Sequence, residues 1–167
     1  VHGYGAIGQG KDVPANKRKY YDPVIRHNGT FVQTKGFCTD VFFTQALHWI
    51  KQNKDKPFFA YVSTNAPHAP FIAPNDKKEK FSGYGFKPNQ QGFYGMIENI
   101  DENVGRLMAR LKEWGLEENT LVIFTSDNGY VLDGLGKGKL GTRAGRPLSA
   151  FTAGLKGRSE EHTSELQ

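Results

Sequence analysis

Two short polar motifs in this chain combine residue types that could do chemistry. Each follows an apolar run: Pro67-His68-Ala69-Pro70 after the first and Ser126-Asp127-Asn128-Gly129 after the second. Asp127 and Asn128 offer a charged and a neutral oxygen, the hard ligands that Ca²⁺ or Mg²⁺ prefers. The imidazole of His68 could donate a hydrogen bond to an anionic group or protonate a departing oxygen. Together these groups suit the transfer of a sulfuryl or phosphoryl group.

Each motif also has a plain structural alternative. Asp127-Asn128-Gly129 is good turn chemistry, because Asp and Asn bond to their own backbone and Gly accepts a positive φ. His68 could equally be a structural histidine of a loop. The position of the two motifs favours the catalytic interpretation, because both follow predicted strands. Ligands of open α/β folds bind at the carboxyl ends of the strands.

Hydrophobic periodicity predicts the two helices that would position these motifs. Near-3.6 spacing predicts a helix at residues 40–53, with Thr39 or Asp40 as its cap. A second helix is expected at residues 92–114, with Gly115 as its left-handed stop. The buried stripe expected in this second helix is Tyr94, Ile97, Ile100, Val104, Leu107, Met108 and Leu111.

Two nearly continuous apolar runs, at residues 58–63 and 120–125, predict strands that are covered on both faces. Residues 65–92 between them, with four prolines, predict a long functional loop. Residues 1–37 predict an irregular surface segment in which Asn28-Gly29 forms a turn. The order helix, strand, loop, helix, strand predicts an α/β protein with a mainly parallel sheet and helices on its faces.

Composition narrows the function classes. The 167 residues, with 37% hydrophobic and 23% charged, suit one globular domain, and no apolar run is long enough to span a membrane. The single cysteine, Cys38, excludes an internal disulfide and a cysteine-built zinc site, and a buried inert thiol is expected. The net charge of +5 favours anionic partners, but no nucleic-acid-binding module is visible.

Four cations in a Gly-rich loop, Lys137, Lys139, Arg143 and Arg146, could meet an anionic substrate, although a solvated loop also accounts for them. The last ten residues, 158–167, resemble the conceptual translation of a sequencing-adapter oligonucleotide. We therefore expect residues 158–167 to be a non-native tail that is no part of the fold.

An ordered set of motifs over residues 1–157 resembles the sulfatase family, within the alkaline phosphatase-like superfamily. The motifs that carry the resemblance are Gly3-Tyr4-Gly5, Gly36-Phe37-Cys38-Thr39-Asp40, Lys56-Pro57-Phe58-Phe59, Asn65-Ala66-Pro67-His68-Ala69-Pro70, Asp101-Glu102-Asn103-Val104-Gly105, Ser126-Asp127-Asn128-Gly129 and Ala153-Gly154-Leu155-Lys156-Gly157. On this resemblance, residues 1–157 are part of a sulfatase catalytic domain.

The resemblance implies a three-layer α/β/α sandwich and a sulfuric ester hydrolase of the arylsulfatase type. It implies a formylglycine nucleophile, a Ca²⁺ ion (Mg²⁺ is less expected) and a sulfated small molecule or polysaccharide as substrate. Asp127 and Asn128 resemble the second pair of metal ligands. His68 resembles the histidine that contacts the sulfate and is a candidate acid toward the leaving group. A periplasmic or secreted location is implied by the family alone.

Other family motifs are missing from this sequence. The Cys/Ser-x-Pro-x-Arg nucleophile motif, the Lys-x-His motif and the first acidic metal pair would all precede Val1. The sulfate-binding lysine would follow Gly157, and Lys156 is the basic residue before it. Cys38 does not lie in a nucleophile motif. The chain therefore resembles an internal fragment, which we expect to be inactive by itself.

Two alternatives remain open. A phosphodiesterase or phosphonate hydrolase of the same superfamily would use similar metal ligands, and the missing nucleophile motif would discriminate between them. A non-catalytic module could instead bind a sulfated glycan through the basic loop at residues 137–146.

Overall fold

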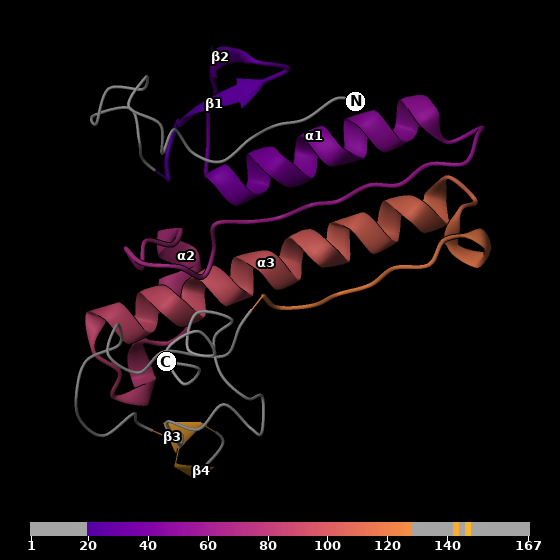
Figure 1. Ribbon diagram of the computed structural model, residues 1–167. Helices are drawn as coiled ribbons and strands as arrows, with labels where there is room; N and C mark the ends of the chain where they lie inside the picture. Colours follow the sequence, from indigo (N-terminus) through magenta and orange to yellow (C-terminus); the bar gives the residue numbers. More distant parts are fainter. Residues whose placement is uncertain (1–19, 128–141, 144–145, 148–167) are drawn as a thin grey trace, which may run out of the picture.

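The computed structural model describes residues 20–127, 142–143 and 146–147 of the chain. The elements in chain order are β1 (Val24–His27), β2 (Thr30–Gln33), α1 (Cys38–Asn53), α2 (Asn75–Glu79), the 3₁₀ turn η2 (Ser82–Tyr84), α3 (Pro88–Glu113), the 3₁₀ turn η3 (Glu117–Asn119), β3 (Thr142–Arg143) and β4 (Arg146–Pro147). The two long helices, α1 and α3, lie side by side, and an extended segment returns along each of them (Figure 1).

The segment before α1 contains a β-hairpin where the sequence predicted irregular structure. Strands β1 and β2 pair antiparallel, with Val24 opposite Gln33 and His27 opposite Thr30. The predicted turn is confirmed: Asn28 and Gly29 both have positive φ, 48° and 87°, as a two-residue hairpin turn of type I′ requires. The sequence did not predict these strands, because β2 is exposed along its whole length. An exposed strand has no alternation of apolar and polar residues to reveal it.

Helix α1 confirms the first helix prediction and corrects its cap. The helix begins at Cys38, and Phe37 occupies the N-cap position without a side-chain cap bond. Asp40 does not cap the helix, because its carboxylate accepts hydrogen bonds from α3 instead. The apolar face of the helix is buried, with Phe42 at 7% and Ile50 at 3% exposure.

Helix α3 also confirms its prediction, with an earlier start. It begins at Pro88, a residue that suits the first helical position because its missing N–H would have no partner there. The N–H of Lys87 donates to Oε1 of Gln90 at 2.8 Å. Gly115 has φ of 70° and stops the helix as predicted.

The buried face of α3 differs in part from the predicted stripe. Leu111 is buried, but Ile97 and Met108 are 40% and 37% exposed. Beside Leu111, the most deeply buried large side chains of α3 are Met96, Asn99 and Asn103, because this face of the helix meets α1 and the preceding loop. Two polar residues therefore occupy interior positions that hydrophobic periodicity would assign to apolar ones.

The long loop predicted at residues 65–92 is partly ordered into short helices. Helix α2 and turn η2 lie within it, and α2 packs against α3. The loop before α2 also comes close to α3 at Gly92, where a Cβ would come within 2.0 Å of the carbonyl oxygen of Phe71. Glycine is required there because any side chain would collide with the loop backbone.

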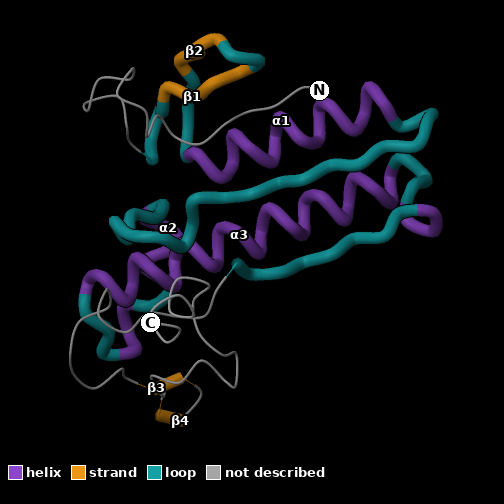
Figure 2. Tube along the Cα trace, viewed as in Figure 1, coloured by secondary structure: helices purple, strands orange, loops and turns teal. Residues whose placement is uncertain are grey.

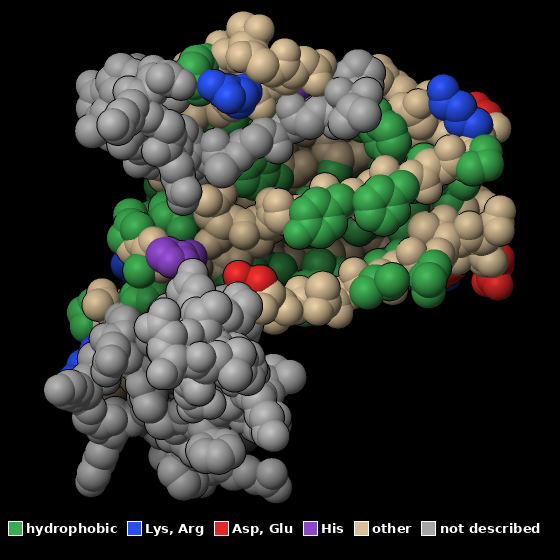
Figure 3. All heavy atoms as spheres, viewed as in Figure 1, with side chains coloured by type: hydrophobic (Ala, Val, Ile, Leu, Met, Phe, Trp, Pro, Cys, Tyr) green, Lys and Arg blue, Asp and Glu red, His purple; other side chains and the backbone are tan. Residues whose placement is uncertain are grey.

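The predicted strands at 58–63 and 120–125 are extended, but they pair with no strand in the described part of the chain (Figure 2). Their expected burial is wrong for these residues: Phe59, Tyr61 and Leu121 are 85%, 79% and 86% exposed. Figure 3 shows hydrophobic side chains on the surface in this part of the molecule. A strand needs a neighbour for its backbone hydrogen bonds, whereas a helix satisfies its own.

The direction of the two extended segments matches the predicted topology. Each runs opposite to the helix before it, so both point toward the same end of the molecule (Figure 1). Two strands that are joined through a helix and point the same way suit a parallel sheet, which is the arrangement the sequence predicted. None of the described helices is long and apolar enough to cross a membrane.

Candidate functional site

His68 lies in a turn directly after the first extended segment. Its backbone N–H donates to the carbonyl oxygen of Asn65 at 2.9 Å, which closes the turn. The side chain is exposed, and the prolines on both sides, Pro67 and Pro70, follow cis peptide bonds. The structure therefore places the imidazole at the surface, after the extended segment that the sequence predicted as a strand.

The imidazole of His68 has one nitrogen already engaged. Nδ1 lies 2.7 Å from the carbonyl oxygen of Ala69. A carbonyl only accepts, so Nδ1 carries the proton and donates it. Nε2 is the nitrogen left to face a reactant: it accepts when the ring is neutral and donates when the ring is protonated.

The loop around His68 is anchored in the core by small and aromatic residues. Ala66 and Ala73 are buried in the main hydrophobic cluster, which also contains Met96 of α3. The ring of Phe71 meets that of Phe93 edge-on, with centroids 5.8 Å apart. These contacts fix both ends of the loop, so the turn that carries His68 is held to α3.

Tyr20 contacts the same turn from far along the sequence. Its hydroxyl donates to the carbonyl oxygen of His68 at 2.9 Å and lies 3.5 Å from that of Asn65. Burial, with a smaller effect from the nearby Cys38 thiol, raises the pKa of Tyr20 to about 12. Sequence reasoning missed this residue, because nothing local to Tyr20 indicates a partner 48 positions away.

A buried polar network joins α1 to α3. The Oδ1 atom of Asp40 accepts from the amides of Asn99 at 2.9 Å and Asn103 at 2.7 Å. Arg106 donates to Oδ1 of Asn103 at 2.8 Å and to the hydroxyl of Thr44 at 3.2 Å. The signal that could have indicated this network is the pair of asparagines four residues apart, which lie on one face of a helix.

Asp127 is exposed, in a bend after the second extended segment, whereas Asn128 lies outside the described residues. Within the described ranges, no group of three or more His, Cys, Asp and Glu side chains is placed to hold a metal ion. Ca²⁺ takes six to eight oxygen ligands, so Asp127 with its neighbour would supply only part of a site. The described residues therefore do not form a complete metal site.

Cys38 is buried, as predicted, at the start of α1. Burial is the main reason that its pKa is raised to about 12. The thiol therefore stays protonated at neutral pH and is a poor nucleophile.

The basic loop is described only in part. Residues 142–143 and 146–147 form the short antiparallel pair β3–β4, in which Arg143 lies opposite Arg146. Lys137 and Lys139 lie outside the described residues, as do residues 158–167.

Comparisons with known proteins agree with one another. The chain is 34% identical over 118 residues to an uncharacterized sulfatase, YdeN, of Escherichia coli (strain K12), a match that covers 69% of this chain and 21% of that protein. It is 36% identical over 96 residues to the human N-acetylgalactosamine-6-sulfatase, covering 56% of this chain and 17% of the human protein. The chain thus spans about a fifth of the length of these relatives.

Solved structures give the same result at the level of the fold. The crystal structure of Ps i-CgsB matches with a TM-score of 0.63 and 33% identity, over 68% of this chain and 26% of that one. The structure of Ps i-CgsB in complex with k-i-k-neocarrahexaose matches with a TM-score of 0.64 and 32% identity. The fold prediction is therefore confirmed: the described part is a portion of the alkaline phosphatase-like α/β fold. Since the family model described as Sulfatase also matches residues 3–163, this chain belongs to the sulfatase family.

Proposed function

We propose that the chain contributes part of the catalytic site of a sulfuric ester hydrolase that acts on a sulfated carbohydrate. Family membership supports the reaction class. Relatives named for N-acetylgalactosamine-6-sulfate, and a structural relative in complex with a carrageenan oligosaccharide, support the substrate class. The observation that carries the proposal is the geometry at His68, an exposed imidazole whose Nδ1 is fixed by the backbone at the end of a strand-like segment.

In this proposal the Nε2 atom of His68 meets the sulfate ester. In the protonated ring Nε2–H donates to a sulfate oxygen or to the bridging oxygen, and the proton can pass to the leaving alcohol. The fixed Nδ1 keeps the ring from flipping, so the proton is presented from one direction.

Asp127 and Asn128 would supply carboxylate and amide oxygens to a Ca²⁺ ion, with the remaining ligands from segments outside the described residues. The bound ion would neutralise charge on the sulfate oxygens. A formylglycine nucleophile from a segment outside this chain and a periplasmic or secreted location complete the proposal.

The test requires a full-length sulfatase that carries this segment. Sulfate release is measured from carrageenan oligosaccharides and from N-acetylgalactosamine-6-sulfate. His68→Ala should lower kcat by about 10²–10⁴-fold, the usual contribution of a general acid. His48→Ala is the matched control, because His48 is also exposed but lies on α1 and bonds to Gln52. Equal activity of the two variants would contradict the role of His68.

The same enzyme tests the metal ligand and the two alternatives. Asp127→Ala should raise the Ca²⁺ concentration needed for half-maximal activity at least about tenfold, while Asp55→Ala, at another exposed site, should not change it. Faster turnover of a phosphate diester than of any sulfate ester would favour the phosphodiesterase. Glycan binding that needs neither Ca²⁺ nor Asp127, without turnover, would favour the binding module.

A further inference from the structure

The turn that carries His68 is held by a side chain from outside its own element. Tyr20 lies in the segment before β1, yet its hydroxyl reaches the carbonyl oxygen of His68 at 2.9 Å. The carbonyl of Asn65, which already accepts from the His68 N–H, lies 3.5 Å from the same hydroxyl. One phenol therefore contacts both ends of the four-residue turn.

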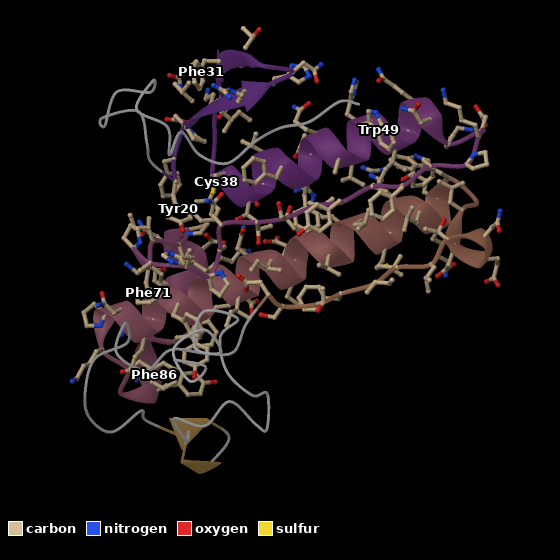
Figure 4. All side chains as sticks on the ribbon, viewed as in Figure 1. Tyr20, Phe31, Cys38, Trp49, Phe71 and Phe86 are labelled. Carbon is tan, nitrogen blue, oxygen red and sulfur yellow. The ribbon has the colours of Figure 1, made fainter. Side chains whose placement is uncertain are left out.

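Tyr20 is itself rigidly placed. Its ring is 7% exposed and stacks on Phe37, with centroids 5.7 Å apart and planes inclined by 18°. Its backbone carbonyl accepts from the N–H of Cys38 at 2.8 Å, which ties it to the first residue of α1. Figure 4 shows Tyr20 beside Cys38 at the start of this helix. Because burial raises its pKa to about 12, the hydroxyl keeps its proton across the working range of an enzyme.

The bond from Tyr20 holds the backbone carbonyl of His68, and the imidazole of His68 bonds to the backbone carbonyl of the next residue. Nδ1 of His68 donates to the carbonyl of Ala69 at 2.7 Å. The orientation of the ring thus depends on the two peptides that follow His68, whose carbonyls accept from Tyr20 and from Nδ1. If the His68 carbonyl loses the Tyr20 hydroxyl, the peptide between His68 and Ala69 can rotate. The Ala69 carbonyl then moves away from Nδ1 of His68.

We propose that Tyr20 is a positioning residue for His68, whose hydroxyl fixes the peptide that sets the direction of the imidazole. The inference rests on the proposed function, since it assigns His68 the contact with substrate. Tyr20 itself touches neither the substrate nor the reacting atoms in this proposal.

The test compares Tyr20→Phe with Tyr21→Phe in the full-length enzyme. Both variants lose one hydroxyl, and both rings contact Phe37, but only Tyr20 bonds to the His68 turn. Tyr20→Phe should lower kcat about tenfold with KM nearly unchanged, the result expected when a reacting group is misplaced by a fraction of an ångström. Tyr21→Phe should match the wild type, and equal kcat losses in the two variants would overturn the proposal.

A double-mutant cycle separates positioning from general stability. In a His68→Ala background, Tyr20→Phe should cost no further activity, because the group it orients is gone. Additive losses would overturn the proposal. If His68→Ala alone leaves kcat unchanged, the proposed function fails first; if His68→Ala is slow but Tyr20→Phe is not, only the present inference fails.

A readout without turnover covers the case in which the folded variant is inactive for another reason. The ¹⁵N shifts of the His68 ring report which nitrogen carries the proton. In the wild type the Nδ1–H form should dominate in the neutral ring, and Tyr20→Phe should mix the two tautomers. Unchanged shifts in a folded Tyr20→Phe enzyme would refute the positioning role.

Discussion

The helical layer and the two extended segments differ sharply in how much of their apolar surface and how many of their backbone hydrogen bonds the described residues provide for. Helices α1 and α3 bury Met96 completely between themselves and the His68 loop, and a polar network joins them. The segments at 58–63 and 120–125 expose aromatic and aliphatic side chains, with Leu121 at 86% exposure. Helices form their backbone hydrogen bonds within one segment, but strands need partners.

The comparison explains why the two halves of the candidate site differ. His68 follows an extended segment but is held by side-chain and backbone bonds from Tyr20, Ala69 and the loop on α3. Asp127 follows the other segment and belongs to no metal-binding group among the described residues. Helical packing therefore holds the turn that carries His68, whereas Asp127 follows a segment without a strand partner in the described part of the chain.

The largest effect is expected at the tight contact between α3 and the His68 loop. Gly92→Ala should destabilise the protein by about 4 kcal/mol, since its Cβ would lie 2.0 Å from the Phe71 carbonyl oxygen. On the same helix, Gly105→Ala meets nothing within 4 Å and should stabilise by about 0.5–1 kcal/mol. Urea unfolding followed by circular dichroism measures both, and shifts of the same sign would contradict the described packing.

The next prediction compares the two regions directly. Met96→Ala should cost about 3 kcal/mol, because it leaves a cavity in the core. Leu121→Ala should change the unfolding free energy of this chain by less than about 0.5 kcal/mol. In a full-length sulfatase Leu121→Ala should instead cost about 2–3 kcal/mol, as a buried strand residue would. A small cost there would mean that the segment stays exposed.

A smaller effect is expected from the network between α1 and α3. Asp40→Ala removes the acceptor of the Asn99 and Asn103 amides and should cost about 2 kcal/mol. Asp55→Ala, which breaks an exposed pair with Lys54, should leave the unfolding free energy unchanged within error. Equal effects on the denaturant midpoint would show that the network contributes no stability.

The smallest effect is a loss of stability in alkali. Folding raises the pKa of Cys38 from 9.0 to about 12, because the buried site disfavours the thiolate. The contribution of the neutral thiol to the unfolding free energy is therefore fully present below pH 9 and is lost as the pH rises toward 12. Between pH 8 and pH 10 the unfolding free energy should fall by about 1.4 kcal/mol from this group. In Cys38→Ala the fall should be smaller by that amount, and an unchanged slope would contradict the burial of the thiol.

Local sequence patterns were sufficient to predict the two helices, the Gly115 stop, the Asn28-Gly29 turn and the buried thiol. Each depends on residues within a few positions of one another, where periodicity and turn chemistry are informative. The order of the motifs also pointed to the sulfatase family, which the comparisons confirm.

Only the tertiary structure revealed the Tyr20 bond to the His68 carbonyl, the asparagine face of α3 and the close approach at Gly92. These contacts join residues far apart in the sequence, and hydrophobic periodicity cannot distinguish a buried asparagine with a partner from an exposed one. The burial predicted for the segments at 58–63 and 120–125 was too high because it, too, depends on residues far away in the sequence. Sequence determines the tendency to extend, but burial is decided by the strands that lie alongside.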